Sequence, residues 1–193
     1  MPSEIIIVSG LPRSGTSLMM QMLEKGGVPV VIDHVRTPDT DNPKGYHEFE
    51  KVKKIKQDAS WLPQTRGQAF KMVSQLLYDL PASEKYRVIF MLRDLDEMLV
   101  SQEKMLKRLN RPAAPAADIK PSFIAHLDRL RDWLGQQQNI QVLYVNYKDL
   151  IEHPHDEAER IRNFLAGAAD AQAMAQAVDP SLYRNRKAEP SGD

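Results

Sequence analysis

The sequence predicts an α/β fold in which a parallel sheet lies between two layers of helices. Two observations predict it. Short apolar runs alternate with amphipathic helical segments along the whole chain, and this order is typical of βαβ units. The length of 193 residues suits one domain with a core large enough to fold unaided. We therefore expect a single domain over residues 1–178, followed by a polar, basic tail over residues 179–193.

The expected strands are short runs of β-branched and other apolar residues, and Arg87–Leu92 is the clearest of them. Each expected helix places apolar residues three or four positions apart, on one face. Gly26 and Pro81 end two of these helices, and Asp94 is a suitable N-cap for a third. The strands are expected at residues 4–9, 28–32, 68–73, 87–92 and 141–145, and the helices at residues 16–25, 48–57, 74–80, 95–109, 121–137 and 156–165, with loops at 33–45 and 110–118.

Composition excludes several classes of function. The 26 Lys and Arg residues balance 26 Asp and Glu residues, which argues against a general nucleic-acid binder. The chain has no cysteine, so it has no disulfide, thiolate zinc site or Cys nucleophile. The first apolar run, Ile5–Val8, is too short for a signal peptide, and no stretch approaches the roughly 20 apolar residues of a membrane span. We expect a cytoplasmic protein with no nucleic-acid or membrane partner.

A glycine-bearing turn connects the first expected strand to the first expected helix, and we call residues 10–17 the phosphate loop. The order of strand, turn and helix can direct backbone N–H groups and the positive end of a helix toward an anion. Gly10 and Gly15 have the spacing of a Walker A loop, but Thr16 stands where that motif requires Lys. Arg13 is the one cation of the loop. The pattern predicts a P-loop-like phosphate site made by Arg13, Ser14, Gly15, Thr16 and Ser17; an ordinary corner with capping hydroxyls is the less favoured alternative.

Three segments resemble one family. The segment Leu11–Leu18 resembles the 5′-phosphosulfate loop of sulfotransferases that use 3′-phosphoadenylyl sulfate (PAPS), in which Pro is followed by Lys or Arg and then by x-Gly-Thr. The run Val88–Asp94 followed by Ser101 resembles the family's 3′-phosphate site, where a strand ends in Arg-Asp and a Ser lies eight residues after the Arg. Leu143–Leu150 resembles the family's strand leading into Tyr-Glu-Asp-Leu. Together they span residue 5 to about residue 165 and imply a PAPS-dependent sulfotransferase.

PAPS has a phosphosulfate at one end and a 3′-phosphate at the other, so it needs two anion sites on neighbouring parts of one sheet. The phosphate loop would hold the first. Arg93, at the end of a strand, and Ser101 would hold the second. In the family a basic C-terminal segment often closes over the 3′-phosphate, which makes Arg184 and Arg186 candidates, although a frayed basic tail explains them equally well.

The resemblance also implies catalytic roles, without a metal ion. Sulfuryl transfer requires charge stabilisation at the leaving phosphate, which we assign to Arg13 and to Lys71; a plain solvated lysine is the alternative for Lys71. Lys71 resembles a lysine of the family that, in the cytosolic small-molecule sulfotransferases, is followed two residues later by a His that acts as the base. Val73 stands at that position here. For the general base we rank Glu48 above His34 and Asp33. The alternative is that Glu48 is an ordinary residue in the first turn of a helix, where the positive end of the helix dipole favours a carboxylate.

The predicted function is transfer of a sulfuryl group from PAPS to a hydroxyl or amine acceptor, leaving adenosine 3′,5′-bisphosphate. One alternative is a P-loop nucleotide or small-molecule kinase, against which the missing Walker lysine and the pair of Arg93 and Ser101 count. The other is a non-catalytic nucleotide-binding module on the same fold. Val73 suggests it, because it stands where the family's His base would be. The pocket for the acceptor is formed by variable loops, so the sequence does not identify the acceptor.

Overall fold

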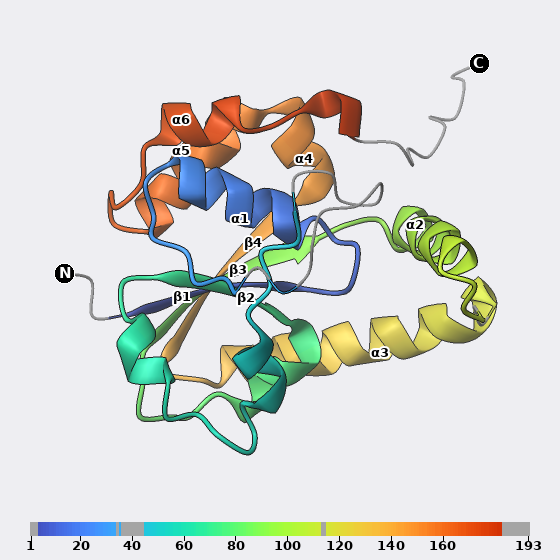
Figure 1. The fold of residues 1–193 in the computed structure, drawn as a ribbon, viewed down its shortest axis with the longest axis horizontal. Helices are drawn as coiled ribbons and strands as arrows, with labels where there is room; N and C mark the ends of the chain where they lie inside the picture. The colour runs from blue at the N-terminus through green and yellow to red at the C-terminus, as the bar shows by residue number, and fades with distance from the viewer. Residues whose placement is uncertain (1–3, 34, 36–44, 113–114, 183–193) are drawn as a thin grey trace.

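The computed structural model describes residues 4–33, 35, 45–112 and 115–182, and over these ranges it is an α/β fold. Four parallel strands form one sheet in the order β2-β1-β3-β4, with helices on both faces (Figure 1). The predicted fold class is confirmed. The strands are β1 (Ile5–Gly10), β2 (Ala69–Val73), β3 (Tyr86–Leu92) and β4 (Ile140–Asn146).

The helices divide between the two faces of the sheet. Figure 1 shows α1, α4, α5 and α6 on one face and α3 on the other. The α-helices are α1 (Thr16–Lys25), α2 (Leu95–Arg108), α3 (Ala116–Gly135), α4 (Tyr147–Glu152), α5 (Pro154–Phe164) and α6 (Ala171–Gln176), and the short 3-10 helices are η1 (Glu50–Lys54), η2 (Leu62–Thr65), η3 (Ser74–Asp79) and η4 (Pro180–Leu182).

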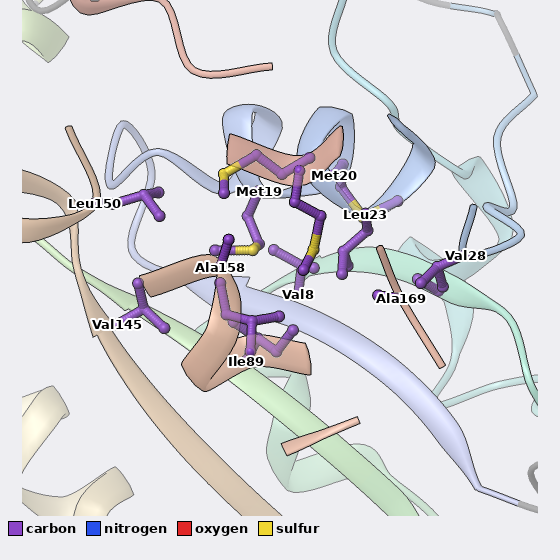
Figure 2. Close-up of a cluster of buried hydrophobic side chains, with 14 of the residues drawn as sticks. Val8, Met19, Met20, Leu23, Val28, Ile89, Val145, Leu150, Ala158 and Ala169 are labelled. Carbon is purple, nitrogen blue, oxygen red and sulfur yellow. The ribbon is translucent and has the colours of Figure 1, made fainter. Parts of the chain in front are cut away.

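The core consists of two apolar clusters, one on each face of the sheet. Alternate residues of β1 enter opposite clusters: Ile6 and Val8 face α1, whereas Ile5 and Ile7 face α3 and the 3-10 helices. Figure 2 shows the first cluster, where Met19, Met20 and Leu23 of α1 lie over Val8. Both faces of β1 are fully buried, which explains why this strand reads as a continuous apolar run.

Several predicted elements match the structure closely. The helix predicted at residues 16–25 has those bounds, and the strands at 87–92 and 141–145 each differ by at most one residue at an end. Asp94 is the N-cap of α2, and its carboxylate accepts hydrogen bonds from the backbone N–H groups of Asp96 and Glu97 at 2.9 and 3.1 Å.

Other predicted elements were wrong in kind or extent. The run at residues 28–32 makes one isolated bridge, between Val30 and Ala69, because Pro29 has no N–H to offer a strand ladder. The helix predicted at 48–57 shrinks to η1, since Phe49 is extended and its ring packs edge-on against Trp61 at 5.1 Å. The segment at 74–80 forms η3 rather than an α-helix. The helix expected from Pro121 begins one turn earlier, within the loop expected at 110–118.

Within the described ranges, no helix combines the length and apolar character needed to cross a membrane. The cytoplasmic location stays a prediction. The boundary at residue 179 also stays a prediction, because residues 183–193 lie outside the described part of the chain.

The strands place their C-terminal ends along one edge of the sheet. Gly10, the last residue of β1, lies opposite Val73 of β2 and Met91 of β3. The segments that follow β1, β2 and β3 therefore leave the sheet side by side, and this edge is where open α/β sheets bind ligands.

Candidate functional site

The phosphate loop makes a tight turn between β1 and α1. Arg13 has φ +70° and Gly15 has φ +101°, so both lie in the left-handed region. A Cβ on Gly15 would lie 2.4 Å from the ring of Tyr147. Gly15 is also the N-cap of α1 and carries no side chain to occupy the first N–H groups of that helix. The loop therefore presents a helix N-terminus beside a cation, as an anion site requires.

Ser14 adds a polar atom to this loop. Its side chain is buried, with 1% of the residue exposed, and Oγ has no hydrogen-bond partner among the described residues. A buried hydroxyl without a partner is uncommon, because it loses its hydrogen bonds to water without replacement. This orphaned oxygen fits a loop that completes its hydrogen bonds with a bound anion.

Arg93 and Ser101 lie directly against the phosphate loop. The Nε–H of Arg13 donates to Ser101 Oγ at 3.1 Å, and Arg93 Nη1 donates to the carbonyl oxygen of Arg13 at 3.1 Å. Ser101 is buried on α2, with 4% of the residue exposed. We call the two expected anion sites, the phosphate loop and the pair of Arg93 and Ser101, the anion corners. These contacts join them into one hydrogen-bonded cluster, built from the segments that follow β1 and β3 and from α2.

The guanidinium of Arg93 is held from two further sides. It lies 4.5 Å from the centre of the Tyr147 ring, and Nε is 3.4 Å from Glu97 Oε2. Both members of the pair with Glu97 are buried, with 9% and 7% of their side chains exposed. Asp96, close to Arg93 in sequence, accepts a hydrogen bond from Lys120 at 2.5 Å. Arg93 is therefore a buried, oriented cation at the end of β3.

Lys71 forms a second cluster on the other side of the loop. Its Nζ donates to Ser17 Oγ at 3.3 Å and to the carbonyl oxygen of Tyr46, and it lies 3.9 Å from Glu48 Oε1. The side chain is only 13% exposed, so the alternative of a plain solvated lysine does not describe it. The structure brings together Lys71 from β2, Ser17 from α1 and Glu48 from the segment before η1.

The candidate bases are placed differently. Glu48 is 21% exposed, and its two carboxylate oxygens lie 3.9 Å from Lys71 and 3.8 Å from Lys53. Asp33 instead accepts hydrogen bonds from the backbone N–H groups of Glu50 at 2.5 Å and Val35 at 3.1 Å. The bond from Glu50 is the main cause that lowers the pKa of Asp33, and a carboxylate so held is a weak proton acceptor. The geometry favours Glu48 over Asp33.

Some candidates lie outside the described residues: His34, Arg184 and Arg186. Thr16 begins α1 at the loop, partly exposed. Tyr147 is a site residue that sequence reasoning missed. It begins α4, directly after β4, and its ring contacts both the Gly15 backbone and the Arg93 guanidinium. The signal was available, since Tyr147 belongs to the third family-like segment, but spacing alone does not show which loop its ring reaches.

Comparison with known proteins gives a consistent result. A family model described as "Sulfotransferase domain" matches residues 3–192. Mouse (Mus musculus) Sulfotransferase 1A1 is 22% identical over 209 aligned residues, which cover 96% of this chain and 67% of the relative.

Two solved structures share the fold. The sulfotransferase domain from the curacin biosynthetic pathway has a TM-score of 0.55 at 16% identity, with 98% of this chain and 93% of that chain covered. Mouse sulfotransferase SULT7A1, solved as a complex with PAP, has a TM-score of 0.52 at 15% identity, with 92% of this chain and 63% of that chain covered.

Proposed function

Because this chain belongs to the sulfotransferase domain family, we propose that it transfers a sulfuryl group from PAPS to a hydroxyl or amine acceptor and releases adenosine 3′,5′-bisphosphate. The observation that carries this proposal is the contact between its two anion corners. Arg13 of the phosphate loop bonds Ser101, and Arg93 bonds the Arg13 carbonyl. A nucleotide with anionic groups at both ends fits such a pair of adjoining sites. SULT7A1, a structural neighbour, was solved with PAP.

The residues present fit the donor. In the proposal, Arg13, the α1 N-terminus and the hydroxyls of Ser14, Thr16 and Ser17 hold the phosphosulfate end, which would supply the orphaned Ser14 oxygen with a partner. Arg93 and Ser101 hold the 3′-phosphate by charge-assisted hydrogen bonds. The cation of Arg93 is already oriented by Glu97 and Tyr147, so little side-chain entropy is lost on binding.

Catalysis is assigned to three side chains. PAPS supplies the sulfuryl group, whose sulfur the acceptor oxygen or nitrogen attacks while the bond from sulfur to the bridging phosphate oxygen breaks. Lys71 and Arg13 stabilise the negative charge that develops on that oxygen. Glu48 accepts the proton that the acceptor loses. The 3.9 Å separation between Lys71 Nζ and Glu48 Oε1 supports these two assignments, because it brings both side chains together on one side of the phosphate loop.

Calorimetry of nucleotide binding tests the donor. We expect adenosine 3′,5′-bisphosphate to bind tightly with or without Mg²⁺ and ATP to bind weakly. The opposite ranking would support the kinase alternative.

Incubation with ³⁵S-labelled PAPS and a broad panel of hydroxyl and amine acceptors tests the transfer. Labelled product that disappears in the Glu48→Gln and Lys71→Met variants supports the assigned roles. Tight bisphosphate binding with no labelled product across the panel would support the non-catalytic binding module.

A further inference from the structure

The segment before η1 lies beside Lys71 of β2, and we call residues 45–49 the base segment. Its main chain is held at its second residue, where the Tyr46 carbonyl accepts hydrogen bonds from Ser17 Oγ at 3.3 Å and from Lys71. It is held at its end by the Phe49 ring, which packs against Trp61. The candidate base, Glu48, lies between these two anchors.

His47, the residue directly before Glu48, is unusual in two ways. Its backbone has φ +50°, in the left-handed region that non-glycine residues seldom adopt. Its side chain is 9% exposed, and Nε2 lies 3.1 Å from Oε2 of Glu24 in the last turn of α1. A left-handed histidine costs free energy and persists only where its surroundings hold it. The contact with Glu24 is one such hold.

The unpaired nitrogen of the ring indicates which way the hydrogen bond runs. His47 Nδ1 is buried and has no hydrogen-bond partner among the described residues. A proton on Nδ1 would leave a buried N–H donor unsatisfied and would set the Nε2 lone pair against a carboxylate. In the neutral ring the proton is therefore on Nε2, and this N–H donates a hydrogen bond to Glu24 Oε2.

We propose that His47, held by Glu24, is a positioning residue that sets the Glu48 carboxylate beside Lys71; the inference rests on the proposed function of Glu48. The left-handed turn at residue 47 lets both of its neighbours reach one cation: the Tyr46 carbonyl and Glu48 Oε1 converge on Lys71 Nζ. If the turn relaxes, Glu48 changes direction. A general base has to be held within hydrogen-bond reach of the proton it accepts.

The variant Glu24→Ala tests the hydrogen bond directly, because it removes the acceptor and changes no residue of the base segment itself. We expect kcat to fall about 10- to 100-fold, as misplacement of a catalytic group by about 1 Å does. The KM for PAPS and the Kd for the bisphosphate should stay unchanged, because Glu24 contacts neither anion corner. Glu24→Gln retains an acceptor oxygen and should restore most of kcat. Lys25→Ala, an exposed neighbour on the same helix end, is the matched control.

Combination with a base variant separates positioning from general stability. In a Glu48→Gln background there is no base to position, so Glu24→Ala should cause no further loss of kcat. A loss of equal size in both backgrounds, or an unchanged kcat in Glu24→Ala alone, would overturn the proposal.

Hydrogen exchange gives a readout that does not depend on activity. Amide exchange in the base segment should be faster in Glu24→Ala than in the parent chain and unaltered in Lys25→Ala. Equal rates in all three proteins would show that Glu24 does not hold the segment. If exchange responds as expected while the parent chain transfers no label from PAPS, the hold on the segment stands and it is the proposed sulfuryl transfer that fails.

Discussion

Arg13 combines a strained backbone with two contacts that fix it. Its φ of +70° is in a region that costs a non-glycine residue roughly 1–3 kcal/mol. Its carbonyl accepts from Arg93 and its Nε–H donates to Ser101, so residues from two other elements hold the strained conformation. Strain maintained in this way is concentrated at functional sites. At the scale of single residues, Arg13 is therefore the contact point between the phosphate loop and the pair of Arg93 and Ser101, the two proposed anion sites.

Replacement of Arg93 tests the second corner. We expect Arg93→Ala to weaken binding of adenosine 3′,5′-bisphosphate by at least about 1–3 kcal/mol, roughly 5- to 150-fold, because a hydrogen bond to a charged group is lost. Calorimetry measures it. The alanine variant leaves the buried Glu97 carboxylate without this cation, so the double variant with Glu97→Gln keeps the test valid if the single one unfolds. Arg162→Ala, at an exposed pair with Glu159, is the control. Unchanged affinity in a folded Arg93 variant would remove this residue from the site.

Gly15 is a position where only glycine fits. An alanine there would adopt φ +101° and place its Cβ 2.4 Å from the Tyr147 ring. We expect Gly15→Ala to lower the free energy of unfolding by roughly 1–3 kcal/mol or more, measured by urea denaturation. Gly135, at the end of α3, has nothing within 4 Å of its would-be Cβ. Gly135→Ala should be neutral or slightly stabilising, and equal losses in both variants would contradict the steric argument.

At the scale of elements, the sequence predicted what local signals determine. The strand at 87–92 and the helix that follows it are marked by a buried apolar run and by the Asp94 cap. The run at 28–32 has the same apolar character, but Pro29 limits it to one bridge beside β2. The helix α6 was missed because it has only six residues and its buried positions are mostly alanine, which gives a weak apolar signal, even though Asp170 caps it through the Ala173 N–H.

In the candidate site, too, only the features that local sequence marks could be predicted. The phosphate loop and the Arg93 corner carry recognisable local sequences, and adjacent parallel strands place them at one edge. The approach of Glu48 to Lys71 was not predictable from spacing. It depends on the left-handed backbone of His47 and on packing of Phe49 against Trp61, and both are tertiary effects.

An ion pair between the half-exposed Arg66 and the buried Glu84 joins the loops that precede β2 and β3, and its contribution to stability should depend on pH. Arg66 donates two hydrogen bonds to Glu84, at 2.8 and 2.6 Å, and these lower the pKa of Glu84, whose side chain is 8% exposed. The folded pKa thus lies below the unfolded value near 4.5. The contribution is complete above that value and is lost as the pH falls through the folded pKa.

We therefore expect the melting temperature of the parent chain to fall on acidification below about pH 4.5, and Glu84→Gln to show a smaller fall over the same range. Thermal melts from pH 7 to pH 3 measure both. Glu103→Gln, which removes an exposed pair with Lys107, should leave the profile unaltered. Parallel profiles for the parent chain and Glu84→Gln would contradict the assignment.

At the scale of the whole molecule, strand order explains why one site can collect residues from distant parts of the chain. The chain passes from β1 to β2 on one side and then returns to place β3 and β4 on the other. The C-terminal edge of the sheet between β1 and β3 is therefore a topological switch point, where open α/β sheets bind ligands. The phosphate loop follows one of these strands and Arg93 follows the other.

A ligand that contacts both the phosphate loop and Arg93 should stabilise the fold as a unit. Adenosine 3′,5′-bisphosphate at 100 times its Kd would add about 2.7 kcal/mol to the free energy of unfolding, which raises the melting temperature of a chain this long by roughly 5–11 °C. ATP at the same concentration should raise it far less. Hydrogen exchange should slow at the phosphate loop and at the start of α2 together, since one molecule contacts both. Protection confined to one of the two segments would mean that the bisphosphate contacts only that segment, and the assignment of both to a single donor nucleotide would then be wrong.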